Sequence, residues 1–496
     1  MLAKIQARII GDKLRGSCPD LVPEYYTSTT NADENIGMSI SSSDSVGLFT
    51  KDISEKIINA EYDIAVHSWK DLPIEPSDKT EIIGTVDRGD IRDVLFVKRD
   101  TAESKKKDTI QILSSSPRRK HNLEISLSEL VPFQFNYLTF SDVRGNIETR
   151  LKKFIDGDFD GIVMAKVAID RILESDDHQA KDFIRKVINQ NKWLILPLSI
   201  FPTAPGQAAI GIEARKDRSD LKKLVNKINN ERVFNNVIKE KNILSEYGGG
   251  CQQKIGVSIY SKKSKQIFSM RGLTEQGKKI NKYDFLDTPK GKKHRKIHEK
   301  LLYPLQNDKN LFSRVNLNND DKVNKLKNSL IYLGRKNVLD NKFRINSNNY
   351  IWTSGLKCWA YASKMGYWIN GSSDSLGNNI FEEVKNFFHN DIELYSLSHL
   401  KTISSNYNVI ATYELKVNKN IIRDLQIHGK KYFYWMSPVQ FDTLIEYYPE
   451  IINANHSCGF GKTYDYLKNK LPKPDQIKCF LSYEHWLSHY KERELS

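Results

Sequence analysis

Tyr62-Asp-Ile-Ala-Val-His-Ser-Trp-Lys-Asp-Leu-Pro73 contains a short apolar run that passes at once into polar residues and a proline. Such a run, bounded by a breaker, predicts a buried strand over residues 62–66. Val94-Leu-Phe-Val97 repeats the pattern, and helix-like segments such as 52–59 alternate with these runs. The alternation predicts a βα architecture with a parallel sheet.

A second set of the same kind extends from about Ile110 to Leu196, and within it Asp160-Gly-Ile-Val-Met-Ala165 predicts a buried strand. Phe201-Pro-Thr-Ala-Pro-Gly206 is too rich in breakers for a helix and predicts a connection. Two similar α/β lobes with a cleft between them are the simplest arrangement. Strand-like runs at 255–260 and 266–271 follow three glycines and predict a small α+β unit.

The polar stretch from Asn307 to Asn328 has the composition of a linker, and Leu330-Ile-Tyr-Leu-Gly334 begins a new strand. We therefore expect five parts, which are lobe 1 at 1–92 plus 198–225, lobe 2 at 93–197, a small α+β domain at 226–305, a polar linker at 306–329, and a further α/β domain at 330–496.

Composition narrows the class of protein. The 496 residues contain no run of about 18 apolar residues and no export signal, so we expect a cytoplasmic chain without a membrane partner. The five cysteines form no CxxC pair, which argues against a metal site and a disulfide framework. The net charge of +15 leaves two readings open, a solvated lysine-rich surface or a polyanionic ligand.

Lys70 and Asp71 stand where the first strand should end, and ligands of open α/β sheets bind at such ends. A carboxylate in a water-poor site can stabilise a developing cation and move protons. A loop salt bridge with Pro73 fixing the turn is the alternative reading of the same residues.

Arginines and hydroxyl groups gather at the other predicted turns. Ser114-Ser-Ser116-Pro-Arg118-Arg119 suits an anion, since guanidinium forks and helix N-termini bind carboxylates. Arg144, Arg150 and Arg171 follow at similar places. Each arginine alone reads as a solvated charge. Together they favour a small ligand with several carboxylates, with phosphate or nucleic acid as competing anions.

One cysteine differs from the other four. Cys251 follows Gly248-Gly-Gly250, so a group attached to its sulfur could swing through the cleft. A generic cysteine is usually a small buried hydrophobe, which is the reading we give Cys18, Cys358 and Cys479.

Taken together, these segments resemble porphobilinogen deaminase over roughly residues 1–300, and six separated motifs agree in order. They are Gly47–Lys51, His67–Pro73, Ser114–Arg119, Val143–Leu151, Ala204–Gln207 and Gly249–Cys251. The resemblance implies two lobes like those of periplasmic binding proteins and a dipyrromethane cofactor joined as a thioether to Cys251. It also implies a transferase, hydroxymethylbilane synthase, which condenses four porphobilinogens with loss of ammonia and releases hydroxymethylbilane for haem biosynthesis.

The same resemblance assigns roles to residues. It implies that Asp71 protonates the leaving amine and stabilises the azafulvene cation. Carboxylate groups of the cofactor and substrate would be held by Lys70, Ser116, Arg118, Arg119, Arg144, Arg150 and Arg171. No metal is required, and we expect a monomer that binds no nucleic acid.

Some residues depart from the family pattern. Leu2-Ala-Lys-Ile-Gln6-Ala7 opens the sequence without the strand and Arg-Gly-Ser turn that usually precede it, Ala208 replaces a glycine and Lys254 replaces a proline. An impaired carboxylate-binding relative without turnover is therefore one alternative, and a non-catalytic binding module of the same fold is another.

The C-terminal region resembles uroporphyrinogen-III synthase more weakly, through Trp352-Thr-Ser354, Tyr432–Pro438 and His456–Tyr464. That family has two α/β lobes, so we expect a shortened domain here. The resemblance implies a bifunctional alternative in which the chain hands its linear product to its own C-terminal domain. Ser437 and Thr463 could equally be ordinary helix caps.

Overall fold

A computed structural model gives the fold in two compact units. Unit 1 comprises Met1–Asp287 and Glu383–His389, and unit 2 comprises Thr288–Glu382 and Asn390–Ser496. The residues that the structure describes are 1–26, 48–73, 78–248, 253–262, 265–286, 297–305, 311–377, 382, 384–388, 392–402, 404 and 406–490.

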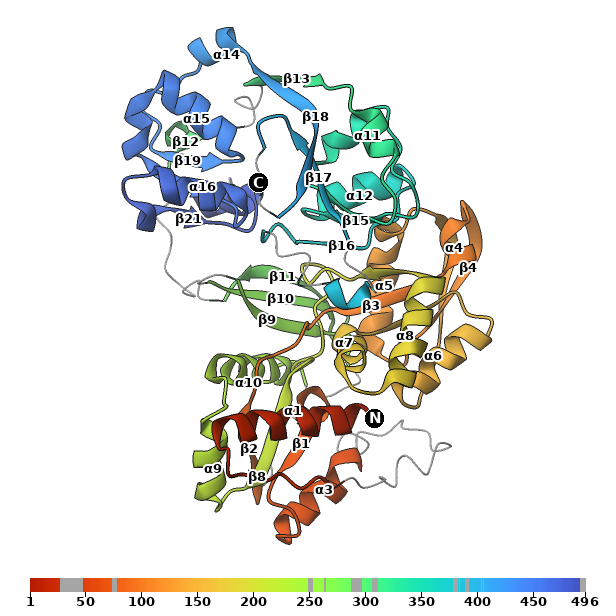
Figure 1. The fold of residues 1–496 in the computed structure, drawn as a ribbon. Helices are drawn as coiled ribbons and strands as arrows, with labels where there is room; N and C mark the ends of the chain where they lie inside the picture. The colour runs from red at the N-terminus through yellow and green to blue at the C-terminus, as the bar shows by residue number, and fades with distance from the viewer. Residues whose placement is uncertain are drawn as a thin grey trace. The chain divides into compact units, whose positions relative to one another are not determined.

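Lobe 1 of unit 1 is a three-stranded sheet in the order β1-β8-β2 (Figure 1). Its strands are β1 (Ala65–Ser68), β2 (Thr80–Thr85) and β8 (Ile210–Arg215), and its helices are α1 (Leu2–Ser17), α3 (Leu48–Ile58) and α9 (Ser219–Asn226). Both pairings are antiparallel, because β8 returns from lobe 2 and lies between the other two strands. The prediction of a parallel sheet is therefore wrong for these strands, whereas the helix predicted at 52–59 is confirmed in α3.

Lobe 2 is a five-stranded sheet in the order β5-β4-β6-β3-β7, flanked by helices (Figure 1). The β4 pairings are parallel and the β3 pairings antiparallel, so the sheet is mixed. The strands are β3 (Asp93–Lys98), β4 (Lys106–Leu113), β5 (Gln134–Ser141), β6 (Gly161–Ala165) and β7 (Asn191–Ile195). The helices are α4 (Arg99–Glu103), α5 (Pro117–Leu130), α6 (Ile147–Asp156), α7 (Lys166–Glu174) and α8 (His178–Gln190).

The small α+β domain has helix α10 (Glu231–Ser245) packed against an antiparallel sheet of β9 (Gly256–Lys262), β10 (Lys265–Leu273) and β11 (Lys279–Phe285). The two predicted strands correspond to β9 and β10. The predicted domain end at residue 305 is wrong, because Leu302 and Tyr303 form β12, which pairs with a strand of unit 2.

Unit 1 also contains a short segment from much later in the chain. We call residues 384–388, with the 3-10 turn η6 (Lys385–Phe387), the clip; it is the cyan turn beside β3 in Figure 1. The Phe387 ring lies 4.8 Å from that of Trp193 and 6.4 Å from that of Phe96. Arg185 Nη1 donates to the carbonyl oxygens of Asn386 and Phe388, at 2.7 and 2.9 Å. The clip therefore completes the apolar core of lobe 2.

Unit 2 contains two sheets, a parallel four-stranded one in the order β12-β19-β20-β21 and a six-stranded one in the order β13-β18-β17-β14-β15-β16. The strands are β12 (Leu302–Tyr303), β13 (Phe312–Asn316), β14 (Leu330–Leu333), β15 (Tyr350–Thr353), β16 (Gly371–Ser372), β17 (Leu394–His399), β18 (Asn408–Val417), β19 (Tyr432–Trp435), β20 (Asn455–Cys458) and β21 (Lys478–Cys479). The α-helices are α11 (Asp320–Asn324), α12 (Leu356–Lys364), α14 (Lys419–Arg423), α15 (Pro438–Tyr447), α16 (Lys462–Lys470) and α17 (Tyr483–Tyr490).

The strand predicted at Leu330 is confirmed as β14. The linker predicted at 306–329 is wrong for residues 312–316 and 320–324, which form β13 and α11. Composition misled the prediction here because β13 is an edge strand with exposed positions, held by pairing with β18.

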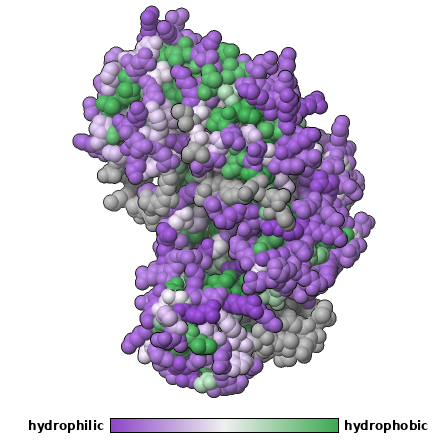
Figure 2. Space-filling model, in the orientation of Figure 1, coloured by the Kyte–Doolittle hydropathy of each residue, from purple (hydrophilic) through white to green (hydrophobic). Residues whose placement is uncertain are grey.

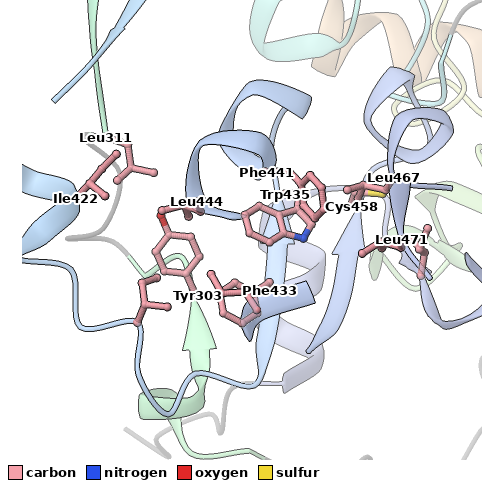
Figure 3. Close-up of a cluster of buried hydrophobic side chains, with 13 residues drawn as sticks. Tyr303, Leu311, Ile422, Phe433, Trp435, Phe441, Leu444, Cys458, Leu467 and Leu471 are labelled. Atoms are coloured by element: carbon pink, nitrogen blue, oxygen red, sulfur yellow. The ribbon is translucent and has the colours of Figure 1, made fainter. Parts of the chain in front are cut away.

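The four-stranded sheet of unit 2 has its own core (Figure 3). Trp435 lies between Phe433 and Phe441, with ring centroids 5.3 and 5.2 Å apart, and Cys458 and Leu467 complete the cluster. On the face in Figure 2, hydrophilic side chains predominate and hydrophobic ones are interspersed in small groups. No helix within the described ranges is long and apolar enough to cross a membrane.

Candidate active site

The turn after β1 places Lys70 and Asp71. It is the 3-10 turn η2 (Trp69–Asp71), anchored by the buried Trp69, whose backbone N–H donates to Ala209 O at 3.1 Å and whose ring lies 5.0 Å from that of Phe234. Burying the tryptophan leaves Lys70 half-buried and Asp71 exposed. On the other side of Asp71, Lys241 Nζ of α10 donates to Leu72 O at 3.1 Å. The exposed carboxylate is thus presented from a turn that is fixed at both ends.

Helix α5 presents the arginine pair. Ser116 is its N-cap and accepts from Arg119 N, and proline at the first position suits a helix start. Arg118 is buried, with Nη1 donating to Pro202 O and Nη2 to Asp93, each at 2.9 Å. Arg119 Nη2 donates to the same carboxylate at 2.6 Å. Arg119 Nε has no hydrogen-bond partner among the described residues.

Charged residues of the two lobes influence one another's pKa at this point. Burial lowers the pKa of Lys70, Arg119 and Arg150 lower it further, and Asp71 and Asp93 oppose the change. Burial likewise lowers the pKa of Arg150, with Arg119 adding to the effect and Asp71 opposing it. Lys70 and Asp71 of lobe 1 therefore interact electrostatically with Arg119 and Arg150 of lobe 2.

The loop that carries Arg144 is tied to the α5 turn. Ser115 Oγ donates to Val143 O and accepts from Val143 N, both at 2.8 Å. Arg144 is exposed, and Arg150 Nε of α6 donates to Gly145 O at 2.6 Å. Gly145 has φ +98, a conformation that favours glycine. The structure thus brings the predicted residues Ser116, Arg144 and Arg150 to one end of lobe 2.

Arg171 lies deeper. It is buried on α7, its Nη2 donates to Ala208 O at 2.8 Å, and burial lowers its pKa to about 10. Ala208 follows Gln207, whose side chain donates to Asp93 Oδ1 at 3.0 Å. Arg171 therefore supports residues 204–209, the segment that joins lobe 2 to β8 of lobe 1, and its role toward the substrate stays a prediction.

Cys251 lies outside the described residues, but both ends of its loop are described. Gln253 Nε2 donates to Tyr247 O, which joins the end of α10 to the residues after the loop. A Cβ at Gly256 would lie 2.2 Å from Pro202 O and 3.0 Å from Arg118 Cδ. Only glycine permits this approach, and it brings the strand after the loop against the arginine pair.

Two buried carboxylates, Asp93 and Glu240, were not predicted from the sequence. The Asp93 carboxylate accepts hydrogen bonds from Arg118, Arg119 and Gln207. Its burial between two guanidinium groups becomes evident only from the structure. Glu240 is fully buried, forms two 2.9 Å hydrogen bonds with Arg88, and accepts from Gly206 N and Ile259 N. The Arg-Asp pair before Val94 was the one available signal for Asp93.

The cluster fits a ligand that bears several carboxylates. Lys70, Arg119 and Arg150 outnumber the exposed acid Asp71, and the buried Arg119 Nε has no hydrogen-bond partner in the part of the chain that the structure describes. Guanidinium edges bind carboxylates in bidentate fashion. Acetate and propionate groups of pyrroles are such carboxylates.

Unit 2 has a second candidate site, at the carboxyl ends of its parallel strands. Arg335 Nη2, just after β14, donates to Met436 O, just after β19, at 2.8 Å. A Cβ at Gly377 would lie 3.2 Å from Phe460 O. Ser437 caps α15, whereas the N-cap of α16 is Gly461 and not Thr463. Segments after strands of both sheets therefore meet.

Comparison with known proteins agrees with the site in unit 1. Residues 1–223 match the family model described as "Porphobilinogen deaminase, dipyromethane cofactor binding domain". The porphobilinogen deaminase of Syntrophomonas wolfei is 34% identical over 251 residues, which are 51% of this chain and 75% of that protein. That of Nostoc sp. is 33% identical over 262 residues, which are 52% and 74% of the two chains.

A porphobilinogen deaminase of Prochlorococcus marinus matches over 325 residues at 29% identity, 65% of this chain and 92% of its own. Among solved structures, the substrate binding protein of an amino acid ABC transporter matches 49% of this chain and 83% of its own at 14% identity. Its TM-score of 0.21 is too low to support an argument.

Proposed function

This chain belongs to the porphobilinogen deaminase family, and from that premise we propose how its residues carry out the reaction. It is a transferase, hydroxymethylbilane synthase, with a dipyrromethane cofactor. The observation that carries the residue assignment is the coupling of Lys70 and Asp71 with Arg119 and Arg150 from the other lobe.

Asp71 is the catalytic residue of this proposal. In each condensation the amine takes up a proton, the bond from the aminomethyl carbon to nitrogen breaks, and ammonia leaves. The carbon then joins the free α-position of the last pyrrole of the growing oligopyrrole, and that position loses its proton. Positive charge develops on the substrate pyrrole as ammonia departs. Asp71 as the carboxylic acid can deliver the proton to nitrogen, and the exposed carboxylate that remains can then stabilise that charge and take up the proton lost from the α-position.

The cations orient the substrate. Lys70, Arg119 and Arg150 neutralise acetate and propionate groups, so the aminomethyl group is directed at Asp71. Ser116 and Arg144, at the same end of lobe 2, contribute further contacts. Arg118 and Arg171 act mainly by fixing Asp93 and Ala208, because their guanidinium groups are buried and bonded there.

Cys251 carries the cofactor in this proposal. The dipyrromethane supplies the primer to which new pyrrole units are joined. The Gln253–Tyr247 bond and the approach of Gly256 to Arg118 support this, because they hold the loop ends beside the arginine pair.

The test is Asp71→Asn in the full chain, with Asp63→Asn as control, since Asp63 is exposed in the same lobe and pairs only with Arg218 among the described residues. We expect D71N to lose at least about 100-fold in turnover of porphobilinogen, in the range of a lost general acid. Its intact mass should still show the dipyrrole, which Cys251→Ala should lack.

Normal turnover by D71N would defeat the assignment of Asp71. A wild-type chain that carries no dipyrrole after incubation with porphobilinogen would instead support an impaired carboxylate-binding relative.

A second function is proposed for unit 2, on the observation that segments after strands of both its sheets meet at the Arg335–Met436 contact. This is a uroporphyrinogen-III synthase activity that takes the linear product from unit 1, in a monomeric cytoplasmic protein. Hydroxymethylbilane supplied to the full chain should yield the type III isomer. Formation of the type I isomer alone would exclude this activity.

A further inference from the structure

Asp93 begins β3 and has no exposed surface. Its Oδ1 accepts from Arg119 Nη2 at 2.6 Å and from Gln207 Nε2 at 3.0 Å, and its Oδ2 accepts from Arg118 Nη2 at 2.9 Å. Gln207 Nε2 also donates to Ile91 O at 2.7 Å. One buried carboxylate therefore connects α5, β3 and residues 204–209, the segment that leads into β8 of lobe 1.

This arrangement orients Arg119. Arginine loses rotamer freedom when it is fixed, and a buried charged partner can supply the ordering before a ligand arrives. The bond to Asp93 uses Nη2, while Nε has no partner among the described residues. Arg119 is thus held by Asp93, and its buried Nε–H still lacks an acceptor among the described residues.

Asp93 also acts on Lys70. A Cβ at Gly206 would lie 3.2 Å from Lys70 N, and the next residue, Gln207, donates to Asp93 Oδ1 at 3.0 Å, so Lys70 lies near this carboxylate. The charged groups that act on its ammonium include Asp71 on its own turn, Asp93 on β3, Arg119 on α5 and Arg150 on α6. Burial and the two arginines lower the pKa of Lys70, and the two carboxylates oppose them. The charge of Asp71 changes during turnover in the proposed function, because Asp71 donates a proton. Asp93 is then the carboxylate near Lys70 whose negative charge stays constant.

We propose that Asp93 is a positioning residue for the condensation, which holds the Arg119 guanidinium in place and keeps the Lys70 ammonium charged for a substrate carboxylate. This inference rests on the proposed function of the same site. It assigns Asp93 no contact with the substrate, since the carboxylate is enclosed by its three donors.

The experiment compares Asp93→Asn with wild type in the full chain, through the pH profile of kcat/KM for porphobilinogen. Loss of the charge should move the alkaline limb to lower pH by about one unit, the size of shift that a nearby opposite charge produces. Asp93→Glu should restore the limb. Asp160→Asn is the matched control, because Asp160 is a buried aspartate of the same lobe that bonds Lys107 and Thr101 instead.

A second measurement reads Lys70 directly. Competitive acylation with acetic anhydride at a series of pH values, followed by peptide mass spectrometry, gives the pH at which Lys70 becomes reactive. That midpoint should fall in D93N and stay unchanged in D160N. An unchanged midpoint in a folded D93N would overturn the inference, even if its turnover were reduced.

If D93N does not fold, the double variant Asp93→Asn with Arg118→Met removes one buried charge of each sign and should show the same lower midpoint. Should wild type prove unable to turn over porphobilinogen, the proposed function fails while the acylation result still decides the role of Asp93.

Discussion

Removing the Phe387 ring should destabilise lobe 2, although residue 387 lies about 200 positions further along the chain than Trp193. The ring is 2% exposed and contacts Trp193 and Phe96, which are 1% and 0% exposed, while Lys166 Nζ lies 5.4 Å from its centroid. Phenylalanine-to-alanine changes in cores cost about 3–5 kcal/mol. The variant cannot lose more stability than the docking of the whole clip contributes. We therefore expect the lower end of this range, about 3 kcal/mol, for Phe387→Ala.

The assay is urea unfolding of the full chain, followed by hydrogen exchange of peptides from β3 and β7. With an m-value of about 3 kcal/mol/M, the urea midpoint of these peptides should fall by about 1 M. Lys385→Ala in the same turn is the control, since Lys385 is exposed and its substitution should change stability by less than about 0.5 kcal/mol. Equal midpoints for wild type and F387A, or an equal loss in K385A, would show that the Phe387 ring does not stabilise lobe 2.

Two further predictions concern buried ionisable groups. Burial raises the pKa of Asp170 to about 6, so the folded chain holds a proton that the unfolded chain releases near pH 4. This contribution to stability is fully present below pH 4 and is lost as pH rises through 6. Wild type should therefore lose about 2 kcal/mol relative to Asp170→Asn between pH 4 and 7, measured by urea unfolding, and a flat difference would contradict it. Burial also raises the pKa of Cys358 to about 12, so iodoacetamide at pH 8 should label the half-buried Cys18 first; earlier labelling of Cys358, read by mass spectrometry, would argue otherwise.

Local pattern was enough to find the turn with Lys70 and Asp71, because a buried strand and its breaker are both encoded within twelve residues. It was also enough for the strands that begin at Gly161 and Leu330. The direction of pairing was not encoded locally, since β8 returns to lobe 1 only after lobe 2 has been completed.

Other features depend on partners far away in the chain. The strand at 312–316 looks like a polar linker until Phe312 is paired with Val417. Asp93 is one aspartate among many until Arg119 and Gln207 are brought to it. Sequence patterns within a window of ten or twenty residues carry no information on such contacts, which is why the organising carboxylate of the site was missed while the arginines around it were found.

The clip also has a consequence for synthesis on the ribosome. Unit 1 is otherwise complete at Asp287, yet Phe387 is made 100 residues later. At about 5–20 residues per second, the nascent lobe waits roughly 5–20 s with Trp193 and Phe96 uncovered. A chain that ends before residue 384 lacks the clip and leaves Trp193 and Phe96 without this cover. The core of lobe 2 is therefore completed only after much of unit 2 has been translated.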